Sequence, residues 1–224
     1  MVGVIIAMER ELEPYIRNGI WERSEYKGKI FYTGEIENEK CVICFAGVGK
    51  VNAAYSATLV IERFSPEFII NTGTSGGLTV LKSKDIVIAE KTVQHDFDTT
   101  ALGDPLGFVG SPVSMVYFPT DKKLSDIFRK ALPEAHYGVV ACGDSFIAGR
   151  DKAEFIVNNF NAIACDMESA AISQVCHMAK VPCVIIRGVS DTAEENTFFE
   201  LLGEVSEKTY LAVAKALARG RELR

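Results

Sequence analysis

The sequence predicts a three-layer α/β/α sandwich around a central mixed, largely parallel sheet. Short apolar runs alternate with helical patterns along the whole chain of 224 residues. Several of these runs are apolar at every position, which is typical of strands buried on both faces. Strands that alternate with helices form layered α/β folds. Because no linker interrupts the alternation, we expect residues 1–224 to form a single domain.

The individual elements follow from runs of four to eight apolar residues for strands and from apolar spacings of three and four for helices. Strands are expected at Val2–Ala7, Ile30–Thr33, Cys41–Ala46, Phe68–Asn71, Ile86–Ala89, Tyr137–Cys142, Ile163–Cys165 and Cys183–Val189. Helices are expected at Glu9–Asn18, Lys50–Phe64, Asp121–Ala131, Asp151–Phe160, Met167–Lys180 and Gly203–Arg219. One long region, Thr92–Pro119, has no helical pattern. A loop of that length in a compact domain usually has a function or contacts a partner.

The composition favours a folded cytoplasmic protein. Hydrophobic residues make up 48% of the chain and charged residues 24%, a balance typical of globular proteins. The net charge of -6 argues against a nucleic-acid partner, since no basic stripe can neutralise phosphates. No apolar stretch reaches the ~18 residues of a membrane helix, and the amino terminus lacks the basic region of a signal peptide. The six cysteines lie mostly in apolar runs, as reduced cysteines do.

Two short motifs resemble a metal site and a nucleotide site, but each lacks a feature that such a site requires. Cys41 and Cys44 have the spacing of a metal-binding pair, but positions i and i+3 of a strand point to opposite faces, and no second pair follows. Gly47–Lys50 resembles part of a phosphate loop. However, Cys44 stands where the first glycine is required, and Val51 replaces the serine or threonine. We therefore expect no metal at Cys41 and Cys44 and no nucleoside triphosphate at Gly47–Lys50.

A third motif, Gly73–Gly77, matches the nucleophile elbow of serine hydrolases around Ser75. That elbow requires a helix immediately after it, whereas Leu78–Lys84 is short and leads to the next strand. The last histidine, His177, falls in the middle of a predicted helix. A serine esterase is thus the weaker alternative, and a glycine-rich turn that lets the backbone approach a ligand fits better.

Glu168 is a charge on a predicted buried face. An apolar stripe along its helix consists of Glu168, Ile172, Val175, Cys176 and Ala179. The opposite, polar side consists of Ser169, Ser173, Gln174, His177 and Lys180. A buried carboxylate without a partner costs several kcal/mol, so it requires a cation, donors or the hydroxyls of a ligand. A solvated carboxylate in the first helical turn is the open alternative.

Other charges stand at strand ends. Arg187 interrupts an apolar run, and buried arginines are nearly always paired, for which Glu168 is a natural partner. Asp191 comes just beyond the end of the same strand, where α/β sheets bind ligands, although an aspartate there can also cap a turn. Glu9, Glu11 and Glu13 follow the first strand, and periodicity does not choose among them.

Six motifs, in order along nearly the whole chain, carry a family resemblance. They are Ala7–Glu11, Gly47–Val51, Asn71–Gly77, Gly143–Gly149, Asp166–Ala171 and Arg187–Asp191. Together they resemble the 5'-methylthioadenosine/S-adenosylhomocysteine nucleosidase family within the purine nucleoside phosphorylase superfamily. The resemblance implies a nucleoside phosphorylase-like fold, hydrolysis of the N-glycosidic bond of an adenine nucleoside, a role in methionine salvage and a homodimer.

The resemblance also implies roles for the charged residues. Asp191 would protonate N7 of the departing adenine, which requires a pKa raised by a dry pocket. Glu11 would be the general base that takes a proton from water. Glu168 would accept hydrogen bonds from the ribose 2'- and 3'-hydroxyls, and Arg187 would hold the water and balance the carboxylates.

The remaining binding residues follow from the same resemblance. The ribose side would be lined by Met167, Met8, Val48, Thr74 and Gly76. Phe146 would stack on the purine, while the backbone of Ile147 reads its exocyclic amine edge. Ser75 and Ser190 complete the expected set. Either Phe198 or Phe199 would cap the site, and the loop 98–111, with Leu102 and Phe108, would reach the 5' pocket of a neighbouring subunit.

Three alternatives differ in the chemistry. A phosphorylase would carry an arginine before the glycine-rich turn, where Asn71 stands, and another where Glu11 stands. A carboxylate would repel phosphate by several kcal/mol in a dry pocket, so hydrolysis is favoured. A futalosine-type nucleosidase would keep the same chemistry with another 5' group. A non-catalytic storage protein of the same fold would have little reason to keep buried charges.

Overall fold

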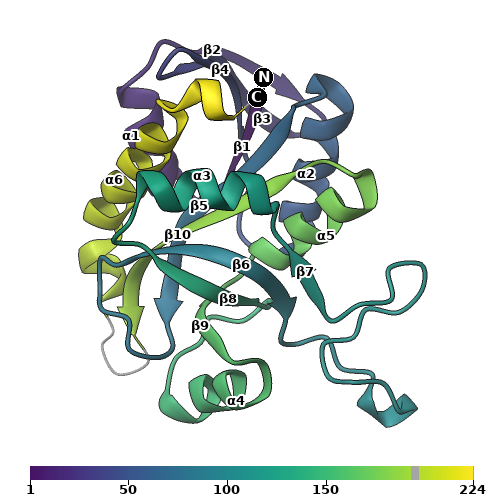
Figure 1. Cartoon of the computed structure of the whole chain (residues 1–224). Coiled ribbons are helices and arrows are strands. Elements are labelled where there is room, and N and C mark those ends of the chain that lie inside the picture. Colours follow the sequence, from purple (N-terminus) through teal and green to yellow (C-terminus); the bar gives the residue numbers. More distant parts are fainter. Residues whose placement is uncertain (193–196, 224) are drawn as a thin grey trace.

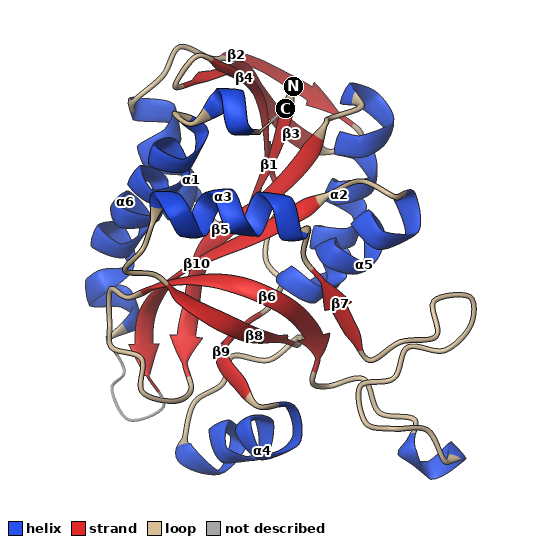
Figure 2. Cartoon of the chain, in the orientation of Figure 1, coloured by secondary structure: helices blue, strands red, loops and turns tan. Residues whose placement is uncertain are grey.

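The computed structural model describes residues 1–192 and 197–223 and has the mixed α/β fold that the sequence predicts (Figures 1 and 2). Its strands are β1 (Val2–Ile6), β2 (Glu22–Tyr26), β3 (Lys29–Ile36), β4 (Glu39–Phe45), β5 (Phe68–Gly77), β6 (Ile86–Gln94), β7 (Tyr117–Pro119), β8 (His136–Cys142), β9 (Ala162–Asp166) and β10 (Cys183–Thr192). Its α-helices are α1 (Glu9–Arg17), α2 (Lys50–Phe64), α3 (Lys122–Ala131), α4 (Arg150–Phe160), α5 (Ser169–Ala179) and α6 (Phe198–Leu217). Two short 3-10 helices, η1 (Thr100–Leu102) and η2 (Gly220–Glu222), complete it.

The strands form one mixed sheet in the order β10-β6-β8-β9-β5-β1-β4-β3-β2, with β7 paired to β6. Strand β10 also pairs in parallel with β5, so β5, β10, β6, β8 and β9 close into a ring. Strand β1 pairs in parallel with both β4 and β5 and carries the sheet outward to the antiparallel β2–β3–β4 edge. Strand β5 therefore belongs to both halves.

The helices cover the sheet in layers (Figure 2). Apolar side chains of α1, α3 and α6 pack into one core cluster, and those of α2 and α5 pack into a second. Helix α4 packs against β8 and β9. Alternation along β4 places Cys41 in the first cluster and Cys44 in the second, so the two sulfurs face opposite sides of the sheet, as strand periodicity predicts.

Two strands were not predicted. Strand β2 has the sequence Glu-Arg-Ser-Glu-Tyr and is mostly exposed. Charged residues of this kind protect an edge strand from aggregation and hide it from an apolar pattern. Strand β7 is only three residues long and falls in the region that was expected to be a loop.

Three predicted boundaries at the site were wrong. The glycine-rich motif Gly73–Gly77 is the end of strand β5 and not a turn. Asp191 lies inside β10 and not beyond it, because the pairing with β5 continues past a bulge between Val189 and Asp191. Helix α6 begins at Phe198, earlier than Gly203.

The predicted face of helix α5 also needs correction. The helix begins at Ser169, so Glu168 precedes its first turn. Ser169 and Ser173 are buried, whereas Ala179 is exposed. The burial of Ser169 is tolerated because its hydroxyl and its N–H both donate to Asp166. Glu168 is buried too, but the strand–helix junction and not the helical stripe places it there.

Within the part of the chain that the structure describes, none of the helices combines the length and the apolar character that spanning a bilayer requires.

Candidate active site

A pocket opens where the carboxyl ends of β1, β5, β9 and β10 meet, and it encloses about 670 Å³ of empty space, counting the solvent at its mouth. That size suits a small-molecule ligand. The pocket is lined by Ala7, Met8, Glu11, Val48, Thr74, Ser75, Gly76, Ser145, Phe146, Ile147, Cys165, Asp166, Met167, Glu168, Ser190, Asp191 and Phe198. Every residue predicted for the site lines this pocket except Arg187, which lies behind its wall.

Glu11 is the buried acid at the start of α1. Its Oε1 accepts hydrogen bonds from the N–H of Thr74 at 2.6 Å and from the Thr74 hydroxyl at 2.9 Å. Its Oε2 accepts from the N–H of Met8 at 3.0 Å. Burial raises the pKa of Glu11, although Arg187 and the Thr74 and Met8 donors oppose the rise. Its neighbours Glu9 and Glu13 are exposed, so of the three acids that periodicity left open only Glu11 is buried and lines the pocket.

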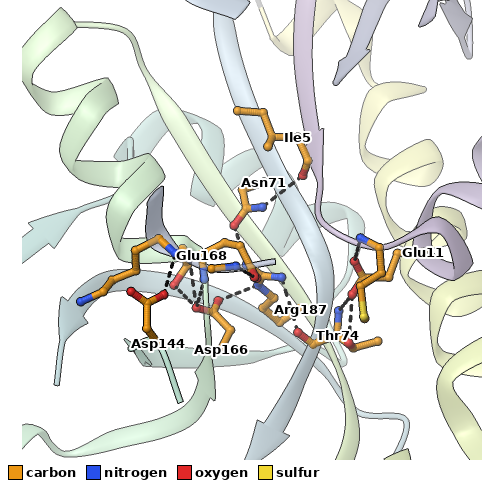
Figure 3. A network of polar contacts seen from close by, with 12 residues as sticks. Ile5, Glu11, Asn71, Thr74, Asp144, Asp166, Glu168 and Arg187 are labelled. Atoms are coloured by element: carbon orange, nitrogen blue, oxygen red, sulfur yellow. Dashed lines mark hydrogen bonds and ion pairs between the residues drawn. The ribbon is translucent and has the colours of Figure 1, made fainter. Parts of the chain in front are cut away.

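Arg187 anchors the polar network of Figure 3. It is fully buried, and its Nε lies 2.7 Å from Oδ2 of Asp166. Its Nη2 donates to Oδ1 of Asn71 at 2.6 Å and lies 3.6 Å from Oε2 of Glu168. The predicted partner, Glu168, is thus the more distant of two. The near partner, Asp166, was missed, although it is a charged residue at the end of the apolar strand β9.

Glu168 faces the pocket from the β9–α5 junction. Its Oε1 accepts a hydrogen bond from the N–H of Gly49 at 3.0 Å. Burial is the main cause that raises its pKa to about 7, with Asp166 adding to the rise and Arg187 opposing it. The solvated alternative is excluded, because the residue is 5% exposed.

Asp191 faces the pocket from β10. The hydroxyl of Ser190 donates to its Oδ1 at 2.6 Å and lies 3.3 Å from the carbonyl oxygen of Ser75. Burial raises the pKa of Asp191, and the Ser190 hydrogen bond only partly opposes it. Because β-bulges often re-aim side chains beside active sites, the bulge at Ser190 accounts for two successive residues both lining the pocket.

Aromatic side chains form the outer wall. The rings of Phe146 and Phe198 meet edge to face at 5.5 Å between centroids. Phe198 lines the pocket, whereas Phe199 is 86% exposed, so of the two only Phe198 contributes to the pocket wall. In the 98–111 loop Leu102 is exposed and Phe108 half-buried. The segment Ala193–Asn196 before the cap lies outside the described residues.

The serine-esterase alternative finds no support at Ser75. The next element after β5 is strand β6 and not a helix. The Ser75 hydroxyl is buried without a hydrogen-bond partner among the described residues. A nucleophilic serine requires a general base within hydrogen-bond reach.

Comparisons with known proteins agree with this geometry. Residues 1–219 match the sequence model of the phosphorylase superfamily. A 5'-methylthioadenosine/S-adenosylhomocysteine nucleosidase of Psychromonas ingrahamii is 39% identical, over 95% of this chain and 92% of its own. An S-adenosylhomocysteine nucleosidase from Streptococcus pyogenes, solved in complex with 5-methylthiotubericidin, superposes with a TM-score of 0.92 at 32% identity, covering 97% of this chain and 96% of that one.

The chain belongs to the 5'-methylthioadenosine/S-adenosylhomocysteine nucleosidase family. It is accordingly an enzyme, a hydrolase of N-glycosyl bonds. An aminodeoxyfutalosine nucleosidase of Campylobacter jejuni is also similar, at 34% identity over 89% of both chains.

Asn71 connects the buried arginine to the first strand. Its side-chain oxygen accepts from Arg187 at 2.6 Å, and its amide donates to the carbonyl of Ile5 at 3.1 Å. The Asn71 side chain therefore connects the buried Arg187 to β1. It is uncharged and provides no cation that could bind a phosphate.

Gly73 is a site residue that the sequence reasoning missed, and it yields a prediction. A Cβ there would lie 2.6 Å from Oε1 of Glu11 and 2.8 Å from Nη1 of Arg187, so both buried groups would have to move. We expect Gly73→Ala to lower kcat for adenine release by about 100-fold, the usual effect of a small displacement at a reacting centre. Gly203→Ala is the matched control, since a Cβ at Gly203 meets nothing within 4 Å. Equal activity of the two variants would show that the close approach at Gly73 has no function.

The raised pKa of Glu168 predicts a pH dependence of stability. Because the folded protein keeps this carboxyl protonated up to about pH 7, against 4.5 without burial, it binds more protons than the unfolded chain across that window. The free energy of unfolding of the wild type, relative to Glu168→Gln, should therefore fall as pH rises from 4.5 to about 7 and stay level above it. Urea titrations at several pH values would measure this. A difference that rises with pH would contradict the assignment.

Proposed function

We propose that this nucleosidase hydrolyses 5'-methylthioadenosine and S-adenosylhomocysteine, releasing adenine and the 5'-thio-substituted ribose. One observation carries the proposal: two buried carboxyl groups with raised pKa values, Glu11 and Asp191, face one pocket from different elements. Glu11 bonds to Thr74, and Asp191 lies beside Gly76. Thr74 and Gly76 are two residues apart on β5, which is roughly 7 Å at the usual rise of a strand. This separation leaves room for a sugar and a water between the carboxyl groups of Glu11 and Asp191.

Asp191 is the proposed acid. As the bond at C1' breaks, negative charge builds on the adenine, and a proton delivered to N7 turns the base into a good leaving group. Burial favours the protonated form of Asp191 that this step requires. The adjacent Ser190 hydroxyl fixes the orientation of the carboxyl group.

Glu11 is the proposed base. Positive charge develops on the ribose as adenine leaves, and a water deprotonated by Glu11 adds to C1'. Arg187, which lies beside the same Gly73 backbone, provides positive charge that opposes the burial-driven rise in the pKa of Glu11 and so favours its basic, ionised form. The base and the acid thus act on opposite partners of the broken bond.

The remaining pocket residues hold the substrate in this proposal. Glu168 accepts hydrogen bonds from the ribose 2'- and 3'-hydroxyls, which supply donors to a buried carboxylate. Met8, Val48 and Met167 pack against the sugar, with Thr74, Ser75 and Gly76 along its other side. Phe146 and Phe198 enclose the purine, and the Ile147 backbone bonds its Watson–Crick edge.

A panel of 5' groups tests the substrate assignment. The purified enzyme would be given 5'-methylthioadenosine, S-adenosylhomocysteine, adenosine and aminodeoxyfutalosine, and kcat/KM for adenine release would be measured for each. We expect the two thio-substituted nucleosides to exceed adenosine by at least tenfold, since an apolar substituent adds transition-state binding of about 1–3 kcal/mol. A preference for aminodeoxyfutalosine would instead support the second candidate, which the similarity to the Campylobacter jejuni enzyme favours. Release of no adenine at all would favour a storage protein.

The proposal also includes the oligomeric state, the cellular location and the pathway of the enzyme. A single nucleoside phosphorylase-like domain acts as a homodimer without a cofactor, in the cytoplasm, within methionine salvage. The segment around η1 supports the dimer: it extends away from the body of the domain (Figure 1), and its Leu102 is 82% exposed. Reduced cysteines support the location, since all six are buried and unpaired in the described chain.

A further inference from the structure

Beside the pocket, three residues form a closed ring of hydrogen bonds through their side chains and two backbone N–H groups, here called the Lys50 ring (Lys50, Asp96 and Asp144). The N–H of Lys50 donates to Oδ1 of Asp144 at 2.7 Å. The N–H of Asp144 donates to Oδ2 of Asp96 at 2.9 Å. The Lys50 ammonium closes the ring on Oδ1 of Asp96 at 2.6 Å. The ring therefore ties together the start of α2, the end of β6 and the loop after β8.

The ring is also connected to helix α5 through Gln94. The Lys50 ammonium also donates to the side chain of Gln94 at 3.0 Å, and Gln94 donates to Gln174 of α5 at 2.7 Å. Although burial opposes it, the hydrogen bonds from Lys50 and Asp144 lower the pKa of Asp96, so this carboxylate stays charged. The Lys50 and Asp96 side chains are only 17% and 30% exposed, which limits screening by solvent.

The ring reaches Glu168 through Gly49. Gly49 caps the amino end of α2 with φ of 97°, a left-handed conformation that favours glycine. Its N–H donates to Oε1 of Glu168, while a Cβ at Gly49 would lie 3.1 Å from Oδ1 of Asp144. Two successive N–H groups at this helix end, those of Gly49 and Lys50, thus each hold a carboxylate, and the helix dipole favours both.

The ring also reaches the purine side of the pocket. Asp144 directly precedes Ser145, Phe146 and Ile147, which line the pocket. Because Asp96 holds the N–H of Asp144, the ring sets where this loop begins. One cluster outside the pocket therefore touches the supports of both the ribose and the purine subsites.

We propose that Lys50 and Asp96 are positioning residues, which hold the Gly49 N–H against Glu168 and so aim this carboxylate at the ribose hydroxyls. The inference rests on the proposed ribose-binding role of Glu168. Neither side chain of the pair lines the pocket, so each acts through Gly49 and Asp144. Loss of the ring would leave the carboxylate free to turn away from the sugar.

The test compares 5'-methylthioadenosine with its 3'-deoxy analogue. Above pH 7, where Glu168 is mainly ionised, loss of a hydroxyl that bonds to this charged carboxylate should lower kcat/KM of the wild type by about tenfold or more. In Lys50→Met, which keeps the backbone N–H, and in the milder Asp96→Asn, we expect this ratio to shrink to about threefold or less. Most of the change should appear as a higher KM for the intact nucleoside. Asp126→Asn is the matched control, because it breaks an ion pair with Lys122 on the exposed face of α3 and should leave the ratio unchanged.

A double-mutant cycle separates positioning from general damage. In a Glu168→Gln background, Lys50→Met should no longer alter the ratio of the two substrates. If the ring variants slow both nucleosides equally, with the wild-type ratio preserved, the ring does not position Glu168 and the inference is wrong. A wild type that releases adenine equally well from both nucleosides would instead overturn the ribose role of Glu168 itself, and the inference with it.

Discussion

Replacing Glu11 by glutamine is expected to lower kcat for adenine release by about 10²–10⁴-fold, the range that general-base catalysis supplies, with little change in KM. Glutamine keeps the size of the side chain and an oxygen for the Thr74 donors, and it loses the hydrogen bond from the Met8 N–H, so most of the pocket contacts should remain. It has no basic lone pair that can take a proton from water. Steady-state kinetics with 5'-methylthioadenosine, alongside thermal unfolding of the same sample, would measure both effects.

Glu13→Gln is the matched control for that variant. Glu13 lies two residues further along α1, is exposed and pairs with Arg10, so its replacement should leave kcat within about twofold, as for other surface changes. If Glu11→Gln retained near-normal turnover, the base would have to be another group, and the account of water activation would be wrong.

Asp191→Asn is expected to lower kcat by a comparable factor, about 10²–10⁴-fold, because asparagine cannot protonate the departing adenine. The change is conservative in shape, and an asparagine oxygen can still accept from the Ser190 hydroxyl that now bonds to Asp191. The loss should therefore appear in kcat rather than in protein stability, which the same thermal unfolding experiment would check.

The leaving group offers a sharper measurement for Asp191. A nitrophenyl riboside releases nitrophenolate, a leaving group that departs without protonation. On that substrate the rates of the wild type and of Asp191→Asn should therefore differ by less than about tenfold, well below the effect on the adenine nucleoside. Equal losses on both substrates would contradict the role of Asp191 as the acid and leave it a merely structural or binding residue.

Much of the fold was predictable because several of its strands are apolar at nearly every position, as in β1, where all five residues are buried. Helix α2 matches its predicted bounds, Lys50–Phe64, because apolar residues recur in it at helical spacing. Edge strand β2 was not predictable, since its charged residues carry no apolar pattern. The closure of β5 and β10 into a ring depends on long-range pairing that local periodicity does not encode.

The site was predictable in its residues but not in their connections. Charges interrupting apolar segments pointed to Glu168 and Arg187, and motifs carried Glu11 and Asp191. The Arg187–Asp166 ion pair and the close approach of Gly73 depend on how strands β5, β9 and β10 come together. The burial of Glu168 was predicted correctly, but from an apolar helical stripe to which this residue does not belong. Its position at the junction of β9 and α5 is what buries it.

The most direct test of the central claim, that water and not phosphate attacks C1', is the identity of the sugar product. The enzyme would be incubated with 5'-methylthioadenosine, with and without excess inorganic phosphate, and the products identified by mass spectrometry. The buried Glu11 carboxylate and the absence of an arginine at Asn71 predict free 5-methylthioribose in amounts equal to adenine, at a rate that phosphate does not change. A sugar 1-phosphate that increases with phosphate concentration would contradict the hydrolytic mechanism.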